Sequence, residues 1–222
     1  MVKRLQYSTY VLTVEGECEK WYFEHLRNLI NANEDKKKTC VYKPDIKTNK
    51  NPKSYAKSFA SLRVPFFHIQ DIEDYNDPLQ RKKFEDLLRD IKEARRIVNY
   101  NLGYSNFTFD LWICLHKKDM PTSKAHRGDY VTDINEAYGT HFEYIDEYKN
   151  EHNFKTILST ITLNDVRNAI KRAKKIRDDN EKDISTALHQ KKIEFSNFSF
   201  YSENPDLNVQ DVVEKILKDC LK

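Results

Sequence analysis

The sequence contains little glycine, with only four glycines among 222 residues. Loops that cradle nucleotide phosphates need several glycines at fixed spacing, and neither the Walker pattern nor G-x-G-x-x-G is present. No apolar run is long enough to span a bilayer, and the N-terminus lacks the apolar core of a signal peptide. These absences argue against a glycine-loop nucleotide-binding protein, and we expect no membrane partner.

Cysteine is also sparse and dispersed. The four cysteines are Cys18, Cys40, Cys114 and Cys220, and no two of them form a C-x-x-C pair. This spacing provides no structural zinc motif and is typical of a protein kept in a reducing compartment. We therefore expect a cytoplasmic protein.

Charge is abundant but nearly balanced. Lys and Arg number 38 against 35 Asp and Glu, so the formal net charge is +3. This excess is too small to indicate nucleic-acid binding on its own. Hydrophobic residues make up 39% of the chain, which at this length is enough for a folded core.

The stretch around which the chain is organised lies near its start. Residues 10–14 are apolar and β-branched and predict a strand, which Glu15 and Gly16 follow directly. Residues 17–31 carry apolar side chains near helical spacing, so a strand, a tight turn and a helix form the first half of a βα unit. Ligands of open α/β sheets bind beyond the carboxyl ends of the strands, which is where Glu15 falls. The alternative is that Glu15 only helps to start the helix.

Acidic residues follow a second predicted strand in the same way. Residues 66–70 form a short apolar run after Pro65, and Asp71, Glu73 and Asp74 come next. If the two strands are parallel neighbours, their acids converge at one edge of the sheet, where Asp74 could take the place of Glu73. Three clustered carboxylates repel one another unless a cation neutralises them, and oxygen ligands favour Mg²⁺ or Mn²⁺ over zinc. Such a site suits phosphoryl chemistry.

Hydrophobic periodicity and turn signals predict the remaining elements. Predicted helices cover residues 79–99, 107–116, 163–179 and 209–221, and predicted strands cover residues 39–46 and 195–201. Ser105 and Asn106 are expected to cap the helix that follows them. We expect an α/β fold in which a mostly parallel sheet is flanked by helices over residues 1–118. Residues 119–222 are expected to form a mainly helical extension, packed on that core within one compact unit.

The predicted helix over residues 163–179 has an apolar face and a basic face. The basic residues that we expect to contact nucleic-acid phosphates are Arg167, Lys171 and Lys174. The alternative is that this face is only solvated, as the polar face of an amphipathic helix commonly is.

Several segments resemble a known family. Residues 14–23, which contain V-E-G-E-x-E, are similar to the opening motif of RloB-like proteins, which have a TOPRIM-type domain. The D-x-D element of that family resembles residues 71–73, and its S-N-P-x-F-E-x-W-x-x-x-H segment resembles residues 105–116. A later family helix and an N-P signature are similar to residues 169–176 and 204–205. The resemblance covers nearly the whole chain in the right order.

The chain departs from the family pattern at three positions. Glu73 stands for an aspartate, Asp110 for a glutamate and Phe107 for a proline. The first two changes keep a carboxylate but alter its reach. The resemblance implies that Glu15 and Asp71 are catalytic. It also implies that these two residues and Glu73 hold a Mg²⁺ or Mn²⁺ ion.

Further acids are candidates for the same site, namely Asp74, Asp110 and Glu19. Asp110 lies in an apolar segment, where a structural role as a hydrogen-bond acceptor is the alternative. Glu19 could instead stabilise the start of a helix. We expect His116 to satisfy the end of its helix rather than to act in catalysis, and Trp112 to belong to the core.

The resemblance also implies a role in bacterial defence against phage, including abortive infection, and a partner ATPase for some members. Related TOPRIM domains are nucleases, primases or topoisomerases, so the fold alone does not select the reaction. Our leading hypothesis is a Mg²⁺- or Mn²⁺-dependent nuclease that hydrolyses phosphodiesters of DNA or RNA, tRNA included. The rival hypothesis is a regulatory or binding subunit with a weak or inactive TOPRIM site that acts through a partner ATPase.

Overall fold

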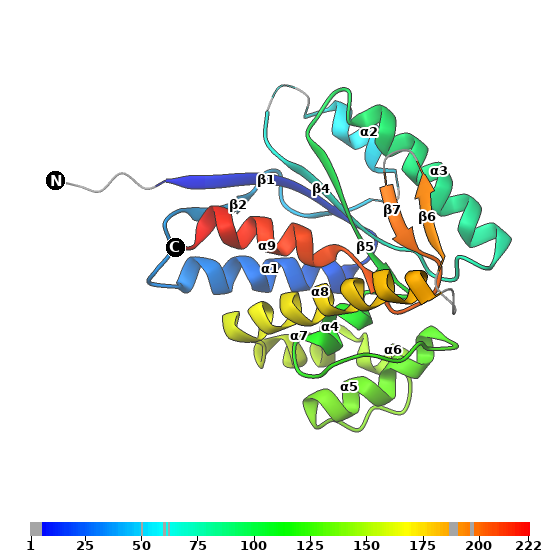
Figure 1. Cartoon of the computed structure of the whole chain (residues 1–222). Coiled ribbons are helices and arrows are strands. Elements are labelled where there is room, and N and C mark those ends of the chain that lie inside the picture. Colours follow the sequence, from blue (N-terminus) through cyan, green and yellow to red (C-terminus); the bar gives the residue numbers. More distant parts are fainter. Residues whose placement is uncertain (1–5, 50, 60, 62, 187–190, 196–197) are drawn as a thin grey trace.

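The computed structural model describes residues 6–49, 51–59, 61, 63–186, 191–195 and 198–222. A curled, mostly parallel β-sheet is flanked by helices, and the second half of the chain is mainly helical (Figure 1). The expected α/β architecture is confirmed. In the described part, every helix is too short or too polar to pass through a bilayer.

The strands form a main sheet and a separate hairpin. The main sheet contains β1 (Tyr7–Val14), β2 (Thr39–Tyr42), β3 (Lys47–Thr48), β4 (Phe66–Asp71), β5 (Tyr100–Asn106) and β8 (Asp206–Leu207). The hairpin pairs β6 (Lys192–Phe195) with β7 (Phe198–Tyr201). The strand expected over residues 195–201 corresponds to the end of β6 and to β7, and residues 196–197 lie outside the described part.

Helices alternate with strands in the first half of the chain and predominate in the second half. They are α1 (Glu17–Ala32), α2 (Pro52–Lys57), α3 (Pro78–Ala94), α4 (Asp110–Leu115), the 3₁₀ helix η2 (Arg127–Asp129), α5 (Tyr130–Tyr138), α6 (Ile145–Tyr148), α7 (Glu151–Ser159), α8 (Leu163–Thr186) and α9 (Val209–Cys220). The predicted helices over residues 17–31 and 209–221 match α1 and α9 to within a residue.

The main sheet brings the two predicted acidic strand ends together. Its order is β2-β1-β4-β5-β8, with β3 also paired to β1. The pairings that connect β1 through β5 are parallel, whereas β8 is antiparallel to β5. β1 and β4 lie side by side with Val14 opposite Ile69, which confirms the predicted adjacency.

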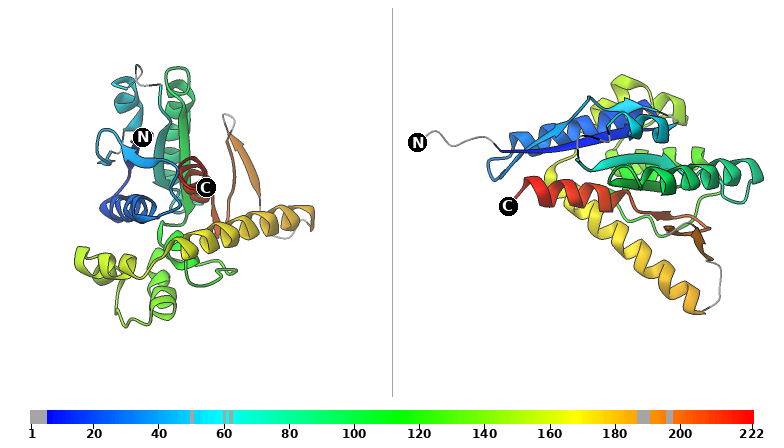
Figure 2. Two further views of the ribbon diagram at one scale, coloured as in Figure 1. Left: turned by 90° about the vertical axis from the view of Figure 1, so that its left-hand side faces the viewer. Right: turned by 90° about the horizontal axis from the view of Figure 1, so that it is seen from above.

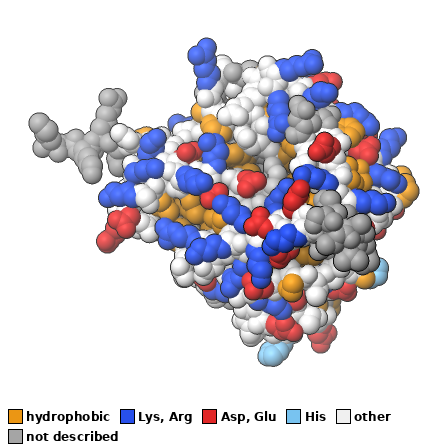
Figure 3. All heavy atoms as spheres, in the orientation of Figure 1, with side chains coloured by type: hydrophobic (Ala, Val, Ile, Leu, Met, Phe, Trp, Pro, Cys, Tyr) orange, Lys and Arg blue, Asp and Glu red, His pale blue; other side chains and the backbone are white. Residues whose placement is uncertain are grey.

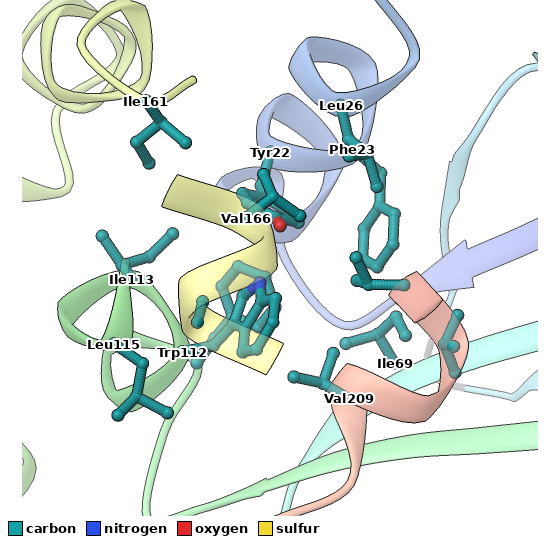
Figure 4. Close-up of a cluster of buried hydrophobic side chains, with 14 of the residues drawn as sticks. Tyr22, Phe23, Leu26, Ile69, Trp112, Ile113, Leu115, Ile161, Val166 and Val209 are labelled. Carbon is teal, nitrogen blue, oxygen red and sulfur yellow. The ribbon is translucent and has the colours of Figure 1, made fainter. Parts of the chain in front are cut away.

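Side chains alternate along the strands and so enter two hydrophobic layers. Leu12 and Ile69 face a layer that includes side chains of α1, α4, α7, α8 and α9. Val11 and Phe66 face the other layer, which includes side chains of α2, α3 and the β6–β7 hairpin. Trp112 is fully buried in the first layer, among side chains of α1, α8 and α9, and its predicted core position is confirmed (Figure 4).

The stretch after α3 differs from the prediction. The helix expected over residues 79–99 ends early, and residues 100–106 form β5. Ser105 and Asn106 are buried within this strand instead of capping a helix. The side-chain amide of Asn106 donates to two backbone carbonyls at the end of β7, those of Tyr201 at 3.4 Å and Ser202 at 3.3 Å. Long-range contacts therefore override the local capping signal, and α4 begins only at Asp110.

Gly103 permits the close packing of β5 against its neighbours. A Cβ atom at this position would lie 2.8 Å from Ile69 Cδ1 and 3.1 Å from Val212 Cγ2. A larger residue would push β4 or α9 away from β5. Gly103 is therefore a packing requirement of a buried strand.

The helix α8 is the longest described helix, with 24 residues, and continues past its predicted end at residue 179. Its apolar side chains, such as Val166 and Ala173, lie in the core as expected. Its C-terminal part runs toward the β6–β7 hairpin, where the hydroxyl of Tyr201 donates to Glu181 (Figure 2). This arrangement ties the hairpin to the helical half of the chain.

Candidate functional site

Two residues predicted to be catalytic lie side by side at the carboxyl end of the sheet. Glu15 follows the last residue of β1, and Asp71 is the last residue of the adjacent strand β4. The backbone N–H of Asp71 donates to Glu15 Oε2 at 3.1 Å. The side-chain amide of Gln70 donates to the same oxygen. The expected convergence of these acids is confirmed, and Gln70 is a neighbour for which the sequence contains no motif.

Glu19 caps the helix that starts beside this pair. Its Oε2 accepts the backbone N–H of Gly16 at 3.0 Å, so its helix-starting role is confirmed. Only 7% of Glu19 is exposed. Burial raises the pKa of Glu19 to about 7, and the charges of Glu15 and Asp110 act in the same direction. The positive charge of Lys149 opposes this rise. Glu19 therefore interacts electrostatically with Glu15, Asp71 and Asp110, and we call these four residues the acidic cluster.

The carboxylate of Asp71 includes an oxygen whose surroundings, in the described part of the chain, contain no hydrogen-bond donor. Its Oδ1 is buried and has no partner among the described residues. Burial raises the pKa of Asp71 well above its usual value, and the charges of Glu19 and Glu15 raise it further. An unpartnered buried polar atom destabilises a fold, and it is a natural contact point for a ligand or a water.

Asp110 joins the cluster through an ion pair. It is the first residue of α4, its side chain is 1% exposed, and its Oδ2 lies 2.8 Å from Lys149 Nζ. The hydroxyl of Thr108 donates to the same oxygen at 2.6 Å. Burial acts to lower the pKa of Lys149, but the attraction of Asp110 and of Asp71 outweighs it and raises that pKa. The structural role considered for Asp110 is therefore real, and Lys149 is a cation of the cluster that no sequence motif marks.

The Glu15–Asp71 pair opens onto a cavity of about 420 Å³. Gln70 and Glu73 line the cavity beside the pair. The other lining residues are Asn51, Pro52, Ile72, Gln80, Lys83, Phe84, Asp86, Leu87 and Asp90. Among these described lining residues, Lys83 is the only base. The cavity is therefore mainly acidic, with one basic side chain contributed by α3.

Glu73 and Asp74 occupy different environments. Glu73 lines the cavity, and its φ of +56° lies in the left-handed region that residues other than glycine seldom adopt. Its backbone N–H donates to Phe107 O at 3.1 Å, which helps to hold this conformation. Asp74 is exposed, and its Oδ1 accepts the N–H of Asn76 at 2.9 Å within a turn. Glu73 is therefore the better placed of the two for a role in the cavity.

The carboxylates do not form a closed metal cage. No group of three or more His, Cys, Asp or Glu side chains in the described part is arranged to hold a metal ion. The carboxylates of Glu15 and Asp71 nevertheless lie close enough to repel each other, and Asp71 Oδ1 has no donor among the described residues. Mg²⁺ is commonly held by one or two carboxylates together with waters and substrate phosphates. The donor set therefore fits Mg²⁺ or Mn²⁺ in an open site.

The basic residues predicted on α8, Arg167, Lys171 and Lys174 (the α8 basic residues), are exposed and do not line the cavity. Lys174 Nζ lies 2.7 Å from Glu214 Oε1, whereas Arg167 and Lys171 have no ion pair within the described part. Basic side chains on the face that shows α8 and α9 are interspersed with acidic ones (Figure 3). Phosphate binding by the α8 basic residues stays a prediction.

His116 is a core residue. It is 1% exposed, its Nε2 lies 3.2 Å from the hydroxyl of Tyr22, and its Nδ1 lies 2.8 Å from Trp112 O. Burial lowers the pKa of His116 to about 4, so the ring is neutral at physiological pH. The expected structural role of His116 is confirmed.

Comparison with known protein families identifies a match over most of the chain. A family model described as RloB-like protein matches residues 10–216, which is most of the chain. No curated protein and no solved structure matches the sequence. The matched range includes both strand-end acids and extends through α8 into α9.

Proposed function

Since the chain belongs to the RloB-like protein family, we propose that it is a metal-dependent nuclease with a TOPRIM-type site. The proposed reaction is hydrolysis of phosphodiesters in DNA or RNA, tRNA included. The proposed setting is the cytoplasm of a bacterium that defends itself against phage, including by abortive infection. The observation that carries this proposal is the hydrogen bond from the backbone N–H of Asp71 to the carboxylate of Glu15, which joins the ends of two parallel strands beside an acidic cavity.

The electrostatics of Asp71 support the choice of a divalent cation. Its Oδ1 has no donor among the described residues, and burial together with the charges of Glu19 and Glu15 disfavours its ionised form. A cation bound at Asp71 and Glu15 would relieve this repulsion, and Glu73 lines the same cavity as a third oxygen donor. When bound, Mg²⁺ or Mn²⁺ supplies charge neutralisation at a phosphate and lowers the pKa of a coordinated water.

The protein's own residues would position the substrate and move a proton. Glu15 is the candidate general base, because it follows β1 directly and is held in place by two N–H donors. Lys83 lines the cavity and offers a positive charge to a phosphate. Lys149 limits the repulsion within the cluster through its ion pair with Asp110. The α8 basic residues would contact more distant phosphates.

A second function is supported by a specific observation. The described part contains no group of three or more acids, histidines or cysteines arranged to hold a metal ion. A site of this kind is compatible with a regulatory or binding subunit in which metal binding is weak and the output is the activity of a partner ATPase. In that case no cation would neutralise the charge of Asp71 in the functional protein, or Asp71 would be protonated.

The two functions can be distinguished with purified protein and end-labelled nucleic acids. Single-stranded DNA, duplex DNA, RNA and tRNA are incubated with the protein in Mg²⁺, in Mn²⁺ and in EDTA. The nuclease proposal predicts metal-dependent cleavage that falls about 10²–10⁴-fold in Glu15→Gln, since a general base contributes this much to rate. Asp71→Asn should also lose activity. Asp74→Asn is the matched control, because it changes an exposed acid of the same loop and keeps a side-chain oxygen acceptor.

A different set of results would contradict the nuclease proposal. If no nucleic acid in the panel is cleaved and calorimetry detects no Mn²⁺ binding to the folded protein, the nuclease proposal is wrong. Stimulation of a partner ATPase by the metal-free protein, unaffected by Glu15→Gln, would then support the regulatory function.

A further inference from the structure

We propose that a hydrogen-bond relay through the interior of the sheet orients the carboxylate of Glu15. Its members are Thr13, His68 and Gln70, which makes them positioning residues for the reaction. The inference rests on the proposed function, because it treats Glu15 as a reacting or metal-binding carboxylate. The relay connects a buried part of the sheet to the cavity, and its members lie outside the acidic cluster.

The relay follows from the register of two strands. Thr13 of β1 and His68 of β4 lie directly opposite each other, and both are fully buried. Thr13 Oγ1 lies 2.9 Å from His68 Nδ1. Gln70 is two residues further along β4, so its side chain leaves the same face as His68, and its Oε1 lies 3.2 Å from His68 Nε2. The nitrogen of the same amide donates to Glu15 Oε2.

Two acceptors beside Gln70 set the direction of the relay. Glu15 Oε2 and the carbonyl oxygen of Asp71 both accept from Gln70 Nε2, the latter at 3.2 Å. The NH₂ group therefore faces these acceptors, and Oε1 faces His68, whose Nε2 must carry a proton. Burial lowers the pKa of His68 to about 4, so at neutral pH the ring has a single N–H. His68 Nδ1 is then an acceptor, and the hydroxyl of Thr13 donates to it.

The alternative placement of the Thr13 and His68 protons would turn hydrogen-bond acceptors toward each other. Thr13 Oγ1 also lies 3.4 Å from Phe67 O, which is an alternative acceptor for its proton. If the hydroxyl donated there, His68 would carry its proton on Nδ1, and its bare Nε2 would face the carbonyl oxygen of Gln70. The amide would have to rotate, which would turn its oxygen toward the carboxylate of Glu15. The proton of Thr13 therefore decides whether Glu15 meets a donor or an acceptor.

The test removes the Thr13 hydroxyl and leaves Glu15 untouched. Thr13→Val deletes the donor, Thr13→Ser keeps it, and Thr9→Val makes the same change on β1 away from the relay. The assay measures cleavage of an end-labelled oligonucleotide, of the class that the wild type cleaves, in Mn²⁺. We expect kcat to fall about 10–100-fold in Thr13→Val at nearly unchanged KM, as is typical when a group that supports a metal ligand is lost. Thr13→Ser should restore most of the rate, and Thr9→Val should match the wild type.

A second variant covers the case in which Thr13→Val does not fold. Gln70 is partly exposed at the end of β4, so Gln70→Met should be tolerated while it removes the donor to Glu15. It should lower kcat by a similar factor. Gln70→Glu should lower kcat further, because it places a negative charge against Glu15. Wild-type kcat in Gln70→Met would overturn the relay, since the amide would then have no effect on Glu15.

Another measurement needs no substrate. The ¹⁵N chemical shifts of the His68 ring should show a protonated Nε2 and a bare Nδ1 at pH 7. In Thr13→Val the Nδ1 signal should shift, because this nitrogen loses its hydrogen-bond donor, while the proton stays on Nε2, which still donates to Gln70 Oε1. A wild-type ring protonated on Nδ1 would overturn the relay. If the wild type neither binds Mn²⁺ nor cleaves any nucleic acid, the proposed function fails, and the positioning role fails with it. The ¹⁵N shifts then still decide whether the relay orients Gln70.

Discussion

Replacing Glu73 by glycine should stabilise the metal-free protein. The backbone of Glu73 has φ +56°, and a left-handed conformation costs a residue with a Cβ atom about 1–2 kcal/mol. Glycine removes this strain but gives the unfolded chain more freedom, which opposes folding by about 0.5–1 kcal/mol. We therefore expect Glu73→Gly to raise the free energy of unfolding by about 0.5–1 kcal/mol, which for a chain of this length is about 1–4 °C in Tm. Urea denaturation and thermal melting in EDTA measure this change.

The matched control is Glu73→Ala, which removes the same carboxylate but keeps the Cβ atom and the strain. Its stability in EDTA should stay at or slightly below that of the wild type. Both variants should lose part of any stabilisation by Mn²⁺, because both lack the side chain that lines the cavity. If Glu73→Gly is less stable than Glu73→Ala, the backbone at this position is not strained in the sense argued. If Glu73→Gly is instead the more stable of the two, the backbone is strained at a residue that lines the cavity, and such strain is typical of functional sites.

Three further predictions address the surroundings of the site. Alanine at the α8 basic residues should weaken nucleic-acid binding and reduce the slope of log K against log salt by about 0.7–0.9 per lost phosphate contact; an unchanged slope would mean that this face is only solvated. Lys149→Met should lower the free energy of unfolding by about 2 kcal/mol, because it leaves Asp110 without its cation. This loss is smaller than the about 3–5 kcal/mol expected for a fully buried pair, since Lys149 is 32% exposed. Lys149→Arg keeps the positive charge and should restore most of the lost stability. His116 has a pKa of about 4, so its contribution to stability is lost as the pH falls from 6.5 toward 4. In His116→Gln the slope of unfolding free energy against pH should be smaller by up to about 1.4 kcal/mol per unit, and an unchanged slope would contradict the buried neutral ring.

The strand-end acids could be predicted because their signal is local. An apolar run followed by an acid predicts both the strand and its end, and parallel βα units place consecutive strand ends at one edge. This reasoning needs no tertiary information, and the positions of Glu15 and Asp71 confirm it. The apolar face of α8 was predictable for the same reason, since helical periodicity is contained in the segment itself.

The strand β5 could not be predicted because tertiary contacts select its residues. Gly103, Ser105 and Asn106 are typical turn and cap residues, yet they are buried between β4, β8 and α9. Lys149 was not predictable either, since an isolated lysine after a short helix acquires meaning only from its contact with Asp110. The division of the chain at residue 118 stays a prediction, although β8 and α9 from the second half pair with or pack against β5.

The measurement that tests the central proposal most directly is the effect of Mn²⁺ on the melting temperature of the wild type and of Asp71→Asn. A ligand at 100 times its Kd stabilises the folded state by about 2.7 kcal/mol. For a chain of this length this corresponds to about 5–10 °C in the wild type. Asp71→Asn should melt at or above the wild-type temperature in EDTA, because it removes a buried charge that Glu19 and Glu15 repel, and it should lose most of the Mn²⁺ shift. A wild-type protein that is folded but shows no shift, or an equal shift in Asp71→Asn, would contradict a metal site at the Glu15–Asp71 pair.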